Sequence, residues 1–340
     1  MKRMHFKLYF PRWFWPNNLG DSIMLSSVFK AIKETYSPCF LEVITDETLV
    51  NTFHNDLYAD KIREPHWWEK GLPEKVYKKK LTNFFINFKG QKSFVIWPDW
   101  QEKTFKYLSK KHNLDECINS PYKNIISYNF ASQISDDIAN FHDLRPRIYL
   151  TQDETSQAKK ELNKNSIAIN IAEIRYTQKR TDGENLRYKR ESWETLVSEI
   201  KHAFPSLTVC EVGQDKFEGI GDKFIPNCSF RKLASLLNEM KLVILSDGGV
   251  HNVCNAIDKK VILFQAYEWN PPDLFKMHNA IFNESLHEKC RKRCHLFSDI
   301  LNLPTMSTNC NKKCYMLDPT KLACECINYL KESHEGTSCG

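Results

Sequence analysis

The sequence lacks any long apolar segment. Its strand-like apolar runs, such as residues 242–245 and 261–264, are far shorter than the roughly 18 to 20 apolar residues that cross a bilayer. This excludes an integral membrane protein. The amino-terminal stretch also lacks the pattern of a secretory signal, because His5, Lys7 and Pro11 interrupt its apolar residues and no small-residue cleavage site follows. Low-complexity segments and short internal repeats are absent as well.

Size and charge place the chain among ordinary globular proteins. At about 150 residues per domain, 340 residues predict two domains, and 41% hydrophobic content suffices for two cores. Charged residues of both signs make up 26% of the chain, which excludes fibrous and disordered classes. The net charge of +6 suits a phosphate-bearing or anionic partner without requiring a nucleic acid.

Twelve cysteines would suit disulfide bonds in a short secreted protein. Because this chain is long and shows no export signal, we expect reduced thiols or metal ligation instead. We therefore expect a cytoplasmic protein, and leave open whether it associates peripherally with the inner face of the membrane.

Apolar runs alternate with amphipathic patterns along the chain. Strand-like runs cover residues 5–10, 40–45, 94–97, 125–128, 167–171, 207–212, 242–246 and 261–264, and helical patterns cover residues 22–36, 193–204, 230–240 and 250–257. This alternation predicts an α/β protein with two Rossmann-like parallel-sheet domains that face a cleft. The polar segment 151–165 predicts a connecting helix, so we place the boundary between domains 1–150 and 151–340.

Ligands of open parallel sheets bind where strands end and helices begin. The first such junction, residues 16–24, lacks the three-glycine dinucleotide fingerprint and contains the pair Gly20-Asp21. Asp21 falls in the first helical turn, where the helix dipole favours a carboxylate. The alternative is a general base that takes a proton from an acceptor hydroxyl.

A second junction follows the strand at 242–246. It reads Asp247-Gly248-Gly249 and runs directly into a helix, whose free N–H groups can converge on an anion such as a diphosphate. A glycine-rich turn with a capping aspartate is the structural alternative.

These two junctions resemble glycosyltransferase family 9, the ADP-heptose heptosyltransferases. The similar stretches are 18–24, 29–33, 242–251 and 255–264. The resemblance implies a GT-B architecture, with Asp21 as catalytic base and Asp247 in contact with the donor sugar. It also implies that the amides of Gly248 and Gly249 hold the donor phosphates, and that His251 lines the nucleotide pocket.

A basic segment at 187–193 occupies the place of the family's phosphate-binding lysine. Lys189, and next Arg187, would neutralise the departing nucleoside diphosphate. A solvated basic loop is the alternative. After the strand at 207–212, Gln214 or Asp215 would reach a ribose hydroxyl.

Cysteines in the segment 290–314 form two pairs with three intervening residues each, namely Cys290, Cys294, Cys310 and Cys314. Four thiolates suit a tetrahedral zinc or iron ion, while free thiols and disulfides remain alternatives. The resemblance implies a structural iron site, as in autotransporter heptosyltransferases, and no catalytic metal. A closing helix over 319–330 places Cys324 and Cys326 as packing residues.

The main hypothesis is an inverting glycosyltransferase. A nucleotide-sugar donor, ADP-heptose first, would give its sugar to a glycan, lipid-linked or protein acceptor. The alternatives are a nucleic-acid-binding protein built on the cysteine module, which we do not favour, and a catalytically silent relative that only binds the donor. Aromatic pairs such as Trp67-Trp68 could stack on a sugar, but internal packing is the more common role.

Overall fold

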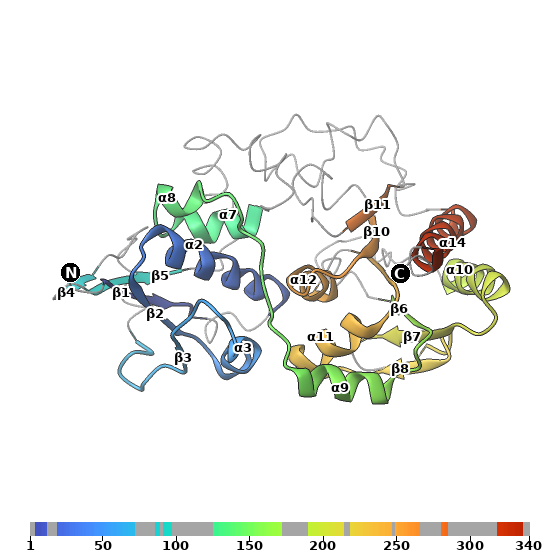
Figure 1. Ribbon diagram of the computed structural model, residues 1–340, viewed down its shortest axis with the longest axis horizontal. Coiled ribbons are helices and arrows are strands. Elements are labelled where there is room, and N and C mark those ends of the chain that lie inside the picture. Colours follow the sequence, from blue (N-terminus) through green and yellow to red (C-terminus); the bar gives the residue numbers. More distant parts are fainter. Residues whose placement is uncertain are drawn as a thin grey trace, which may run out of the picture.

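The described strands form two sheets, one in each half of the chain (Figure 1). The computed structural model describes residues 4–11, 19–71, 86–88, 91–96, 125–171, 190–213, 218–246, 249–265, 280–284 and 318–335. Strand order is β3-β2-β1-β5-β4 in the first sheet and β11-β10-β9-β6-β7-β8 in the second. The predicted α/β class is therefore confirmed.

The first half contains β1 (Met4–Tyr9), α1 (Leu19–Ser22), the 3-10 helix η2 (Ile23–Ser26), α2 (Ser27–Thr35), β2 (Cys39–Ile44), α3 (Glu47–Phe53), β3 (Lys61–Arg63), β4 (Ile86–Phe88), β5 (Gln91–Val95), α7 (Ile125–Ser132) and α8 (Asp136–Ala139). The second contains α9 (Gln152–Glu161), β6 (Ser166–Asn170), α10 (Arg190–Ala203), β7 (Thr208–Val212), β8 (Lys223–Ile225), α11 (Phe230–Glu239), β9 (Val243–Ser246), α12 (Gly249–Ala256), β10 (Val261–Gln265), β11 (Ala280–Glu284) and α14 (Pro319–Glu335).

The first sheet has one apolar and one polar face. Phe6 and Leu8 of β1 point into the core with the apolar side of α2, whereas Lys7 lies opposite Glu42 of β2 on the other face. The sheet is not wholly parallel, because β4 runs antiparallel to β5 at the edge. Only two residues separate β4 from β5, and a connection that short joins antiparallel neighbours.

The described strand pairs of the second sheet are all parallel. Every residue of β6 is buried, as expected for a strand with both faces covered. α10 and α14 pack side by side on one face, where Trp193 and Leu322 share a cluster (Figure 1). On the other face, Val253 of α12 joins a cluster that extends to Phe6 and Leu8 of the first half. The two halves therefore share an apolar core.

Two predictions about local structure were wrong. Residues 125–128 are not a strand but the start of α7, and Ser127 to Phe130 are all buried. A short segment buried on all sides shows neither strand nor helix periodicity, so the sequence pattern could not distinguish them. Cys324 lies on α14 as expected but is exposed, whereas Cys326 is buried.

Among the described helices, none is long and apolar enough to cross a membrane.

Arg231 on α11 joins the two halves. The residue is 7% exposed, and its side chain donates to the Thr52 carbonyl of α3 at 2.9 Å and to the Tyr149 carbonyl at 2.8 Å. Two further N–H groups bind both carboxylate oxygens of Glu154 at 2.6 Å. Glu154 also completes a capping box with Thr151 at the start of α9. One guanidinium thus fixes α3, the connection between the halves and the α9–α11 pair.

Arg231→Ala should lower the free energy of unfolding by about 3 kcal/mol, because it leaves a partly buried carboxylate and two carbonyls without their donor. Lys232→Ala is the matched control on the same helix: it removes the 3.1 Å pair with Glu161, in which the Lys232 side chain is 50% exposed and the Glu161 side chain 34% exposed. That loss should be less than about 1 kcal/mol. Urea unfolding at pH 7 measures both, and equal losses would contradict the role given to Arg231.

Candidate active site

Gly20 and Gly249 bring the helices after β1 and β9 into backbone contact. A Cβ atom on Gly20 would lie 2.6 Å from the Cα of Gly249 and 3.3 Å from Nδ2 of Asn252. Only a residue without a side chain allows this approach. A Cβ on Gly249 would lie 3.7 Å from the Cα of Gly20, an ordinary contact. The first junction of the first half thus meets the start of α12 in the second.

The two predicted acidic residues flank this contact in the sequence. Asp21 follows Gly20 and lies in the first helical turn, in α1, as expected. Its side chain, and all of Asp247 and Gly248, lie outside the described residues. The contact between Gly20 and Gly249 therefore brings together the two helices that these motifs begin.

Polar residues line the buried side of α12. His251 is fully buried, and Asn252 and Asn255 are almost fully buried. Gly249 itself is exposed at the amino end of the helix, where the helix dipole carries a partial positive charge. An anion placed at this end of α12 would lie next to Gly20.

The carboxyl ends of β6 and β7 are fixed by side chains. Nδ2 of Asn170 donates to the Val212 carbonyl at 2.6 Å. The buried carboxylate of Glu211 accepts the N–H groups of Glu218 at 2.8 Å, Gly221 at 2.6 Å, and Ile220. These bonds hold residues 218–221 against the end of β7. Gln214 and Asp215 lie outside the described residues.

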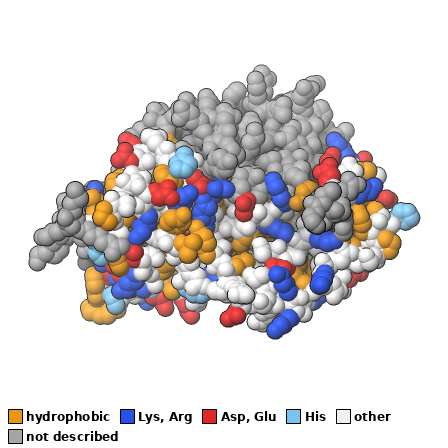
Figure 2. All heavy atoms as spheres, viewed as in Figure 1, with side chains coloured by type: hydrophobic (Ala, Val, Ile, Leu, Met, Phe, Trp, Pro, Cys, Tyr) orange, Lys and Arg blue, Asp and Glu red, His pale blue; other side chains and the backbone are white. Residues whose placement is uncertain are grey.

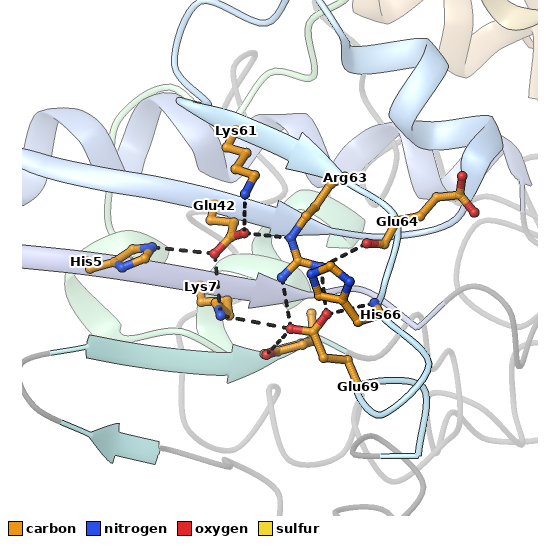
Figure 3. Close-up of polar contacts among 9 residues, drawn as sticks. His5, Lys7, Glu42, Lys61, Arg63, Glu64, His66 and Glu69 are labelled. Carbon is orange, nitrogen blue, oxygen red and sulfur yellow. Dashed lines mark hydrogen bonds and ion pairs between the residues drawn. The ribbon is translucent and has the colours of Figure 1, made fainter.

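The first sheet buries a charged network that sequence patterns did not predict (Figure 3). Glu69 is fully buried and binds Arg63 through two hydrogen bonds, Nη1 to Oε2 at 2.6 Å and Nη2 to Oε1 at 2.9 Å. Arg63 Nε also binds Glu42 at 2.7 Å, and Lys7 lies 3.5 Å from Glu42. Tyr9, the last residue of β1, donates to Glu69 at 3.1 Å. This network fixes the carboxyl edge of the sheet.

Several predicted site residues lie outside the described residues. They are Arg187, Lys189, Gln214, Asp215, Asp247, Gly248 and the cysteines Cys290, Cys294, Cys310 and Cys314. α10 begins directly after Lys189, and its Trp193 is buried, so the Trp-containing helix expected after the basic segment is present. Within the described part of the chain, no group of three or more His, Cys, Asp or Glu side chains could hold a metal ion.

Similar folds identify the architecture. No family model and no curated protein matches the sequence. Among solved structures, the family 9 glycosyltransferase of Veillonella parvula DSM 2008 is 14% identical, with a TM-score of 0.58 over 96% of this chain and 97% of that one. The chain has the fold of the family 9 glycosyltransferases.

Two further solved structures agree with this fold. ADP-heptose LPS heptosyltransferase II of E. coli is 10% identical, with a TM-score of 0.59 over 97% of this chain and all of that one. The iron-containing dodecameric glycosyltransferase TibC of enterotoxigenic E. coli H10407 is 13% identical, with a TM-score of 0.59 over all of this chain and 82% of that one. The predicted GT-B architecture is therefore confirmed.

Gly20→Ala should lower the free energy of unfolding by about 1 to 3 kcal/mol, because the new methyl group overlaps the backbone of α12. Two controls carry the same change. Gly249→Ala places its Cβ at an ordinary contact distance across the same interface, and a Cβ at Gly71 meets nothing within 4 Å. Both should stay within about 0.5 kcal/mol of the parent. Chemical unfolding of the three variants tests this, and an unaffected Gly20→Ala protein would argue against the close contact.

Proposed function

We propose that this chain is an inverting glycosyltransferase that transfers a sugar, heptose first, from a nucleotide-sugar donor to a hydroxyl group of an acceptor. The observation that carries this proposal is the contact between Gly20 and Gly249, which joins the Gly-Asp motif of one half to the Asp-Gly-Gly motif of the other. Asp21 directly follows Gly20 in the sequence, and Asp247 comes two residues before Gly249. Because consecutive Cα atoms are about 3.8 Å apart, the proposal places both acids beside this contact. The fold supports the proposal: the TibC structure with a TM-score of 0.57 is a heptosyltransferase in complex with ADP-D-β-D-heptose.

The amino end of α12 would hold the donor. The amides of Gly248 and Gly249 would bind its diphosphate with the help of the helix dipole. Asp247 would contact the sugar. His251, expected to line the nucleotide pocket, is fully buried, so it would support the wall of that pocket from behind. The ribose would bind Gln214 or Asp215 at the end of β7.

Asp21 would act as general base. Its carboxylate takes the acceptor proton as the hydroxyl oxygen attacks the anomeric carbon from the face opposite the diphosphate. A new glycosidic bond forms, the anomeric C–O bond to phosphate breaks with its electron pair, and the configuration inverts. Lys189 and Arg187 would stabilise the leaving nucleoside diphosphate together with α12, so this mechanism needs no catalytic metal.

The nucleic-acid hypothesis has less support. A nucleic-acid partner favours Lys and Arg gathered on one face. On the face shown in Figure 2, the described basic side chains lie among acidic ones instead.

Asp21→Asn should reduce sugar transfer by at least about 10²-fold, because the amide cannot accept the acceptor proton. Binding of ADP-heptose, measured as a thermal shift, should change little, since binding the donor does not require the base. Asp153→Asn on the exposed first turn of α9 is the control and should retain transfer. Unchanged turnover in Asp21→Asn would remove Asp21 from the mechanism, and a protein that binds ADP-heptose without transferring it to any acceptor would be the silent relative.

The proposal includes a structural metal, iron or zinc, held by Cys290, Cys294, Cys310 and Cys314. Its support is the thiolate set and the iron-containing description of TibC. Four protein ligands would leave no position for substrate, so the ion would stabilise the fold alone. Elemental analysis of the purified protein should find about one equivalent of iron or zinc, lost in Cys290→Ser. Cys324→Ser is the control, since this thiol is exposed on α14. Metal content unaffected by Cys290→Ser would contradict the site.

A further inference from the structure

The turn that follows β3 presents two tryptophans to solvent. Trp67 is 86% exposed and Trp68 is 53% exposed, and both lie in the turn formed by residues 66–70. This contradicts the packing role that the sequence favoured for the pair. Single exposed apolar residues are normal, but two adjacent exposed indoles form a patch that calls for a partner.

A buried carboxylate holds this turn in place. Oε2 of Glu69 accepts the N–H of His66 at 2.9 Å, and the N–H of Glu69 donates to the His66 carbonyl at 2.9 Å. Arg63 and Tyr9 bind the same carboxylate from the sheet. Burial alone would raise the pKa of Glu69, but these hydrogen bonds outweigh it and lower the pKa to about 2. The carboxylate therefore stays charged at neutral pH, and the turn is preorganised.

The ring of His66 adds to the patch. Its centroid lies 6.1 Å from that of Trp68, with an angle of 16° between the planes. The backbone on both sides of the indoles is already fixed. Binding a ligand there therefore costs the protein little conformational entropy.

The turn lies on the same edge of the sheet as the proposed active site. Tyr9 is the last residue of β1, the strand that precedes the helix with Asp21, and its hydroxyl binds Glu69 directly. Arg63 ends β3, two strands from β1, which is about 10 Å across the sheet. The tryptophans thus lie at the carboxyl edge of the first sheet, in the half that carries the proposed base Asp21.

The local charge favours a sugar over an anionic membrane. Membrane-surface sites surround their aromatic residues with basic side chains that attract anionic lipids. Here Arg63 and Lys7 are paired with Glu42 and Glu69, and the exposed Lys70 of the turn is offset by the exposed Glu64. The described residues beside the indoles therefore carry no excess of positive charge. A sugar ring has an apolar C–H face and a rim of hydroxyl groups, which match the face and the polar N–H of an indole.

We propose that the turn formed by residues 66–70 is an acceptor subsite, in which Trp67 and Trp68 stack on the sugar rings of a glycan. This rests on the proposed function and narrows its acceptor to a molecule that carries sugar rings near the reacting hydroxyl. Glu69 acts as a positioning residue, because it sets the turn without contacting the glycan.

The test measures binding to an array of oligosaccharides built of glucose, galactose and heptose. Trp67→Ala and Trp68→Ala should each weaken the best-bound glycan about 10-fold, and Trp67→Phe should keep part of the affinity. Leu57→Ala is the matched control, since Leu57 is 72% exposed in the same half and lies outside the turn. The variants should keep the parent's melting temperature, because these side chains leave the core unchanged.

Glu69→Gln tests the anchor separately. It weakens the two-bond pairing with Arg63, so glycan affinity should fall although both tryptophans remain. The ADP-heptose thermal shift should stay the same in all these variants.

Three results would overturn the subsite. They are glycan binding that is unchanged in both Trp variants, no glycan binding by the parent, and Trp-dependent binding to phosphatidylglycerol vesicles in place of glycans. Failure of the proposed function is distinguishable, because the parent would then show no ADP-heptose thermal shift while Trp-dependent glycan binding persists.

Discussion

A contact between two backbones determines how the two described halves of the chain meet. Gly20 and Gly249 approach so closely that a Cβ on Gly20 would lie within 2.6 Å of the neighbouring Cα. Packed helices normally stand 8 to 10 Å apart because side chains separate them, and glycine removes that separation. The contact therefore places the start of α1 against the start of α12. Both helices follow strands at the centre of their sheets, so the register of each sheet determines what meets at this point.

The rest of the chain keeps this contact from shifting. At the other end of α12, the carbonyl of Ala256 accepts the N–H of Ile148 at 2.8 Å, so the connection between the halves holds the helix from behind. That connection is attached to the first half by Asp143, which binds Arg145 and Arg147 of the same segment and Lys30 of α2 at 3.1 Å. Burying such charges costs desolvation energy, and the gain is a defined geometry more than added stability. Together with Arg231, these pairs restrict sliding of one half over the other.

The sequence predicted the parts of this structure that depend on local pattern. Most strands and helices follow apolar periodicity, and the structure confirms β6, β9 and α12 close to where that periodicity placed them. The charged network was missed for a physical reason. In β1 and β2, Lys7 and Glu42 alternate with apolar residues, which is also the pattern of a strand with one solvated face. Only the register, which sets Lys7 opposite Glu42, shows that they pair.

The same limit explains the tryptophans and the central contact. Tryptophan is a residue type that usually packs inside a protein, so sequence alone favours a buried Trp67 and Trp68. Their exposure follows from the Glu69 hydrogen bonds that fix the turn. A Gly-Asp pair likewise indicates a turn or helix start without revealing what it touches.

The two glycines at the contact have different physical reasons to be glycine. At Gly20 a side chain would meet backbone that cannot move aside, so close packing demands glycine there. At Gly249 a Cβ would meet only an ordinary contact, so packing leaves that position free. At the exposed amino end of a helix, a residue without a side chain leaves the backbone accessible, and this is the geometry of helix ends that bind anions in other proteins. The first glycine thus fixes where the two halves meet, and the second leaves the backbone exposed beside that meeting point.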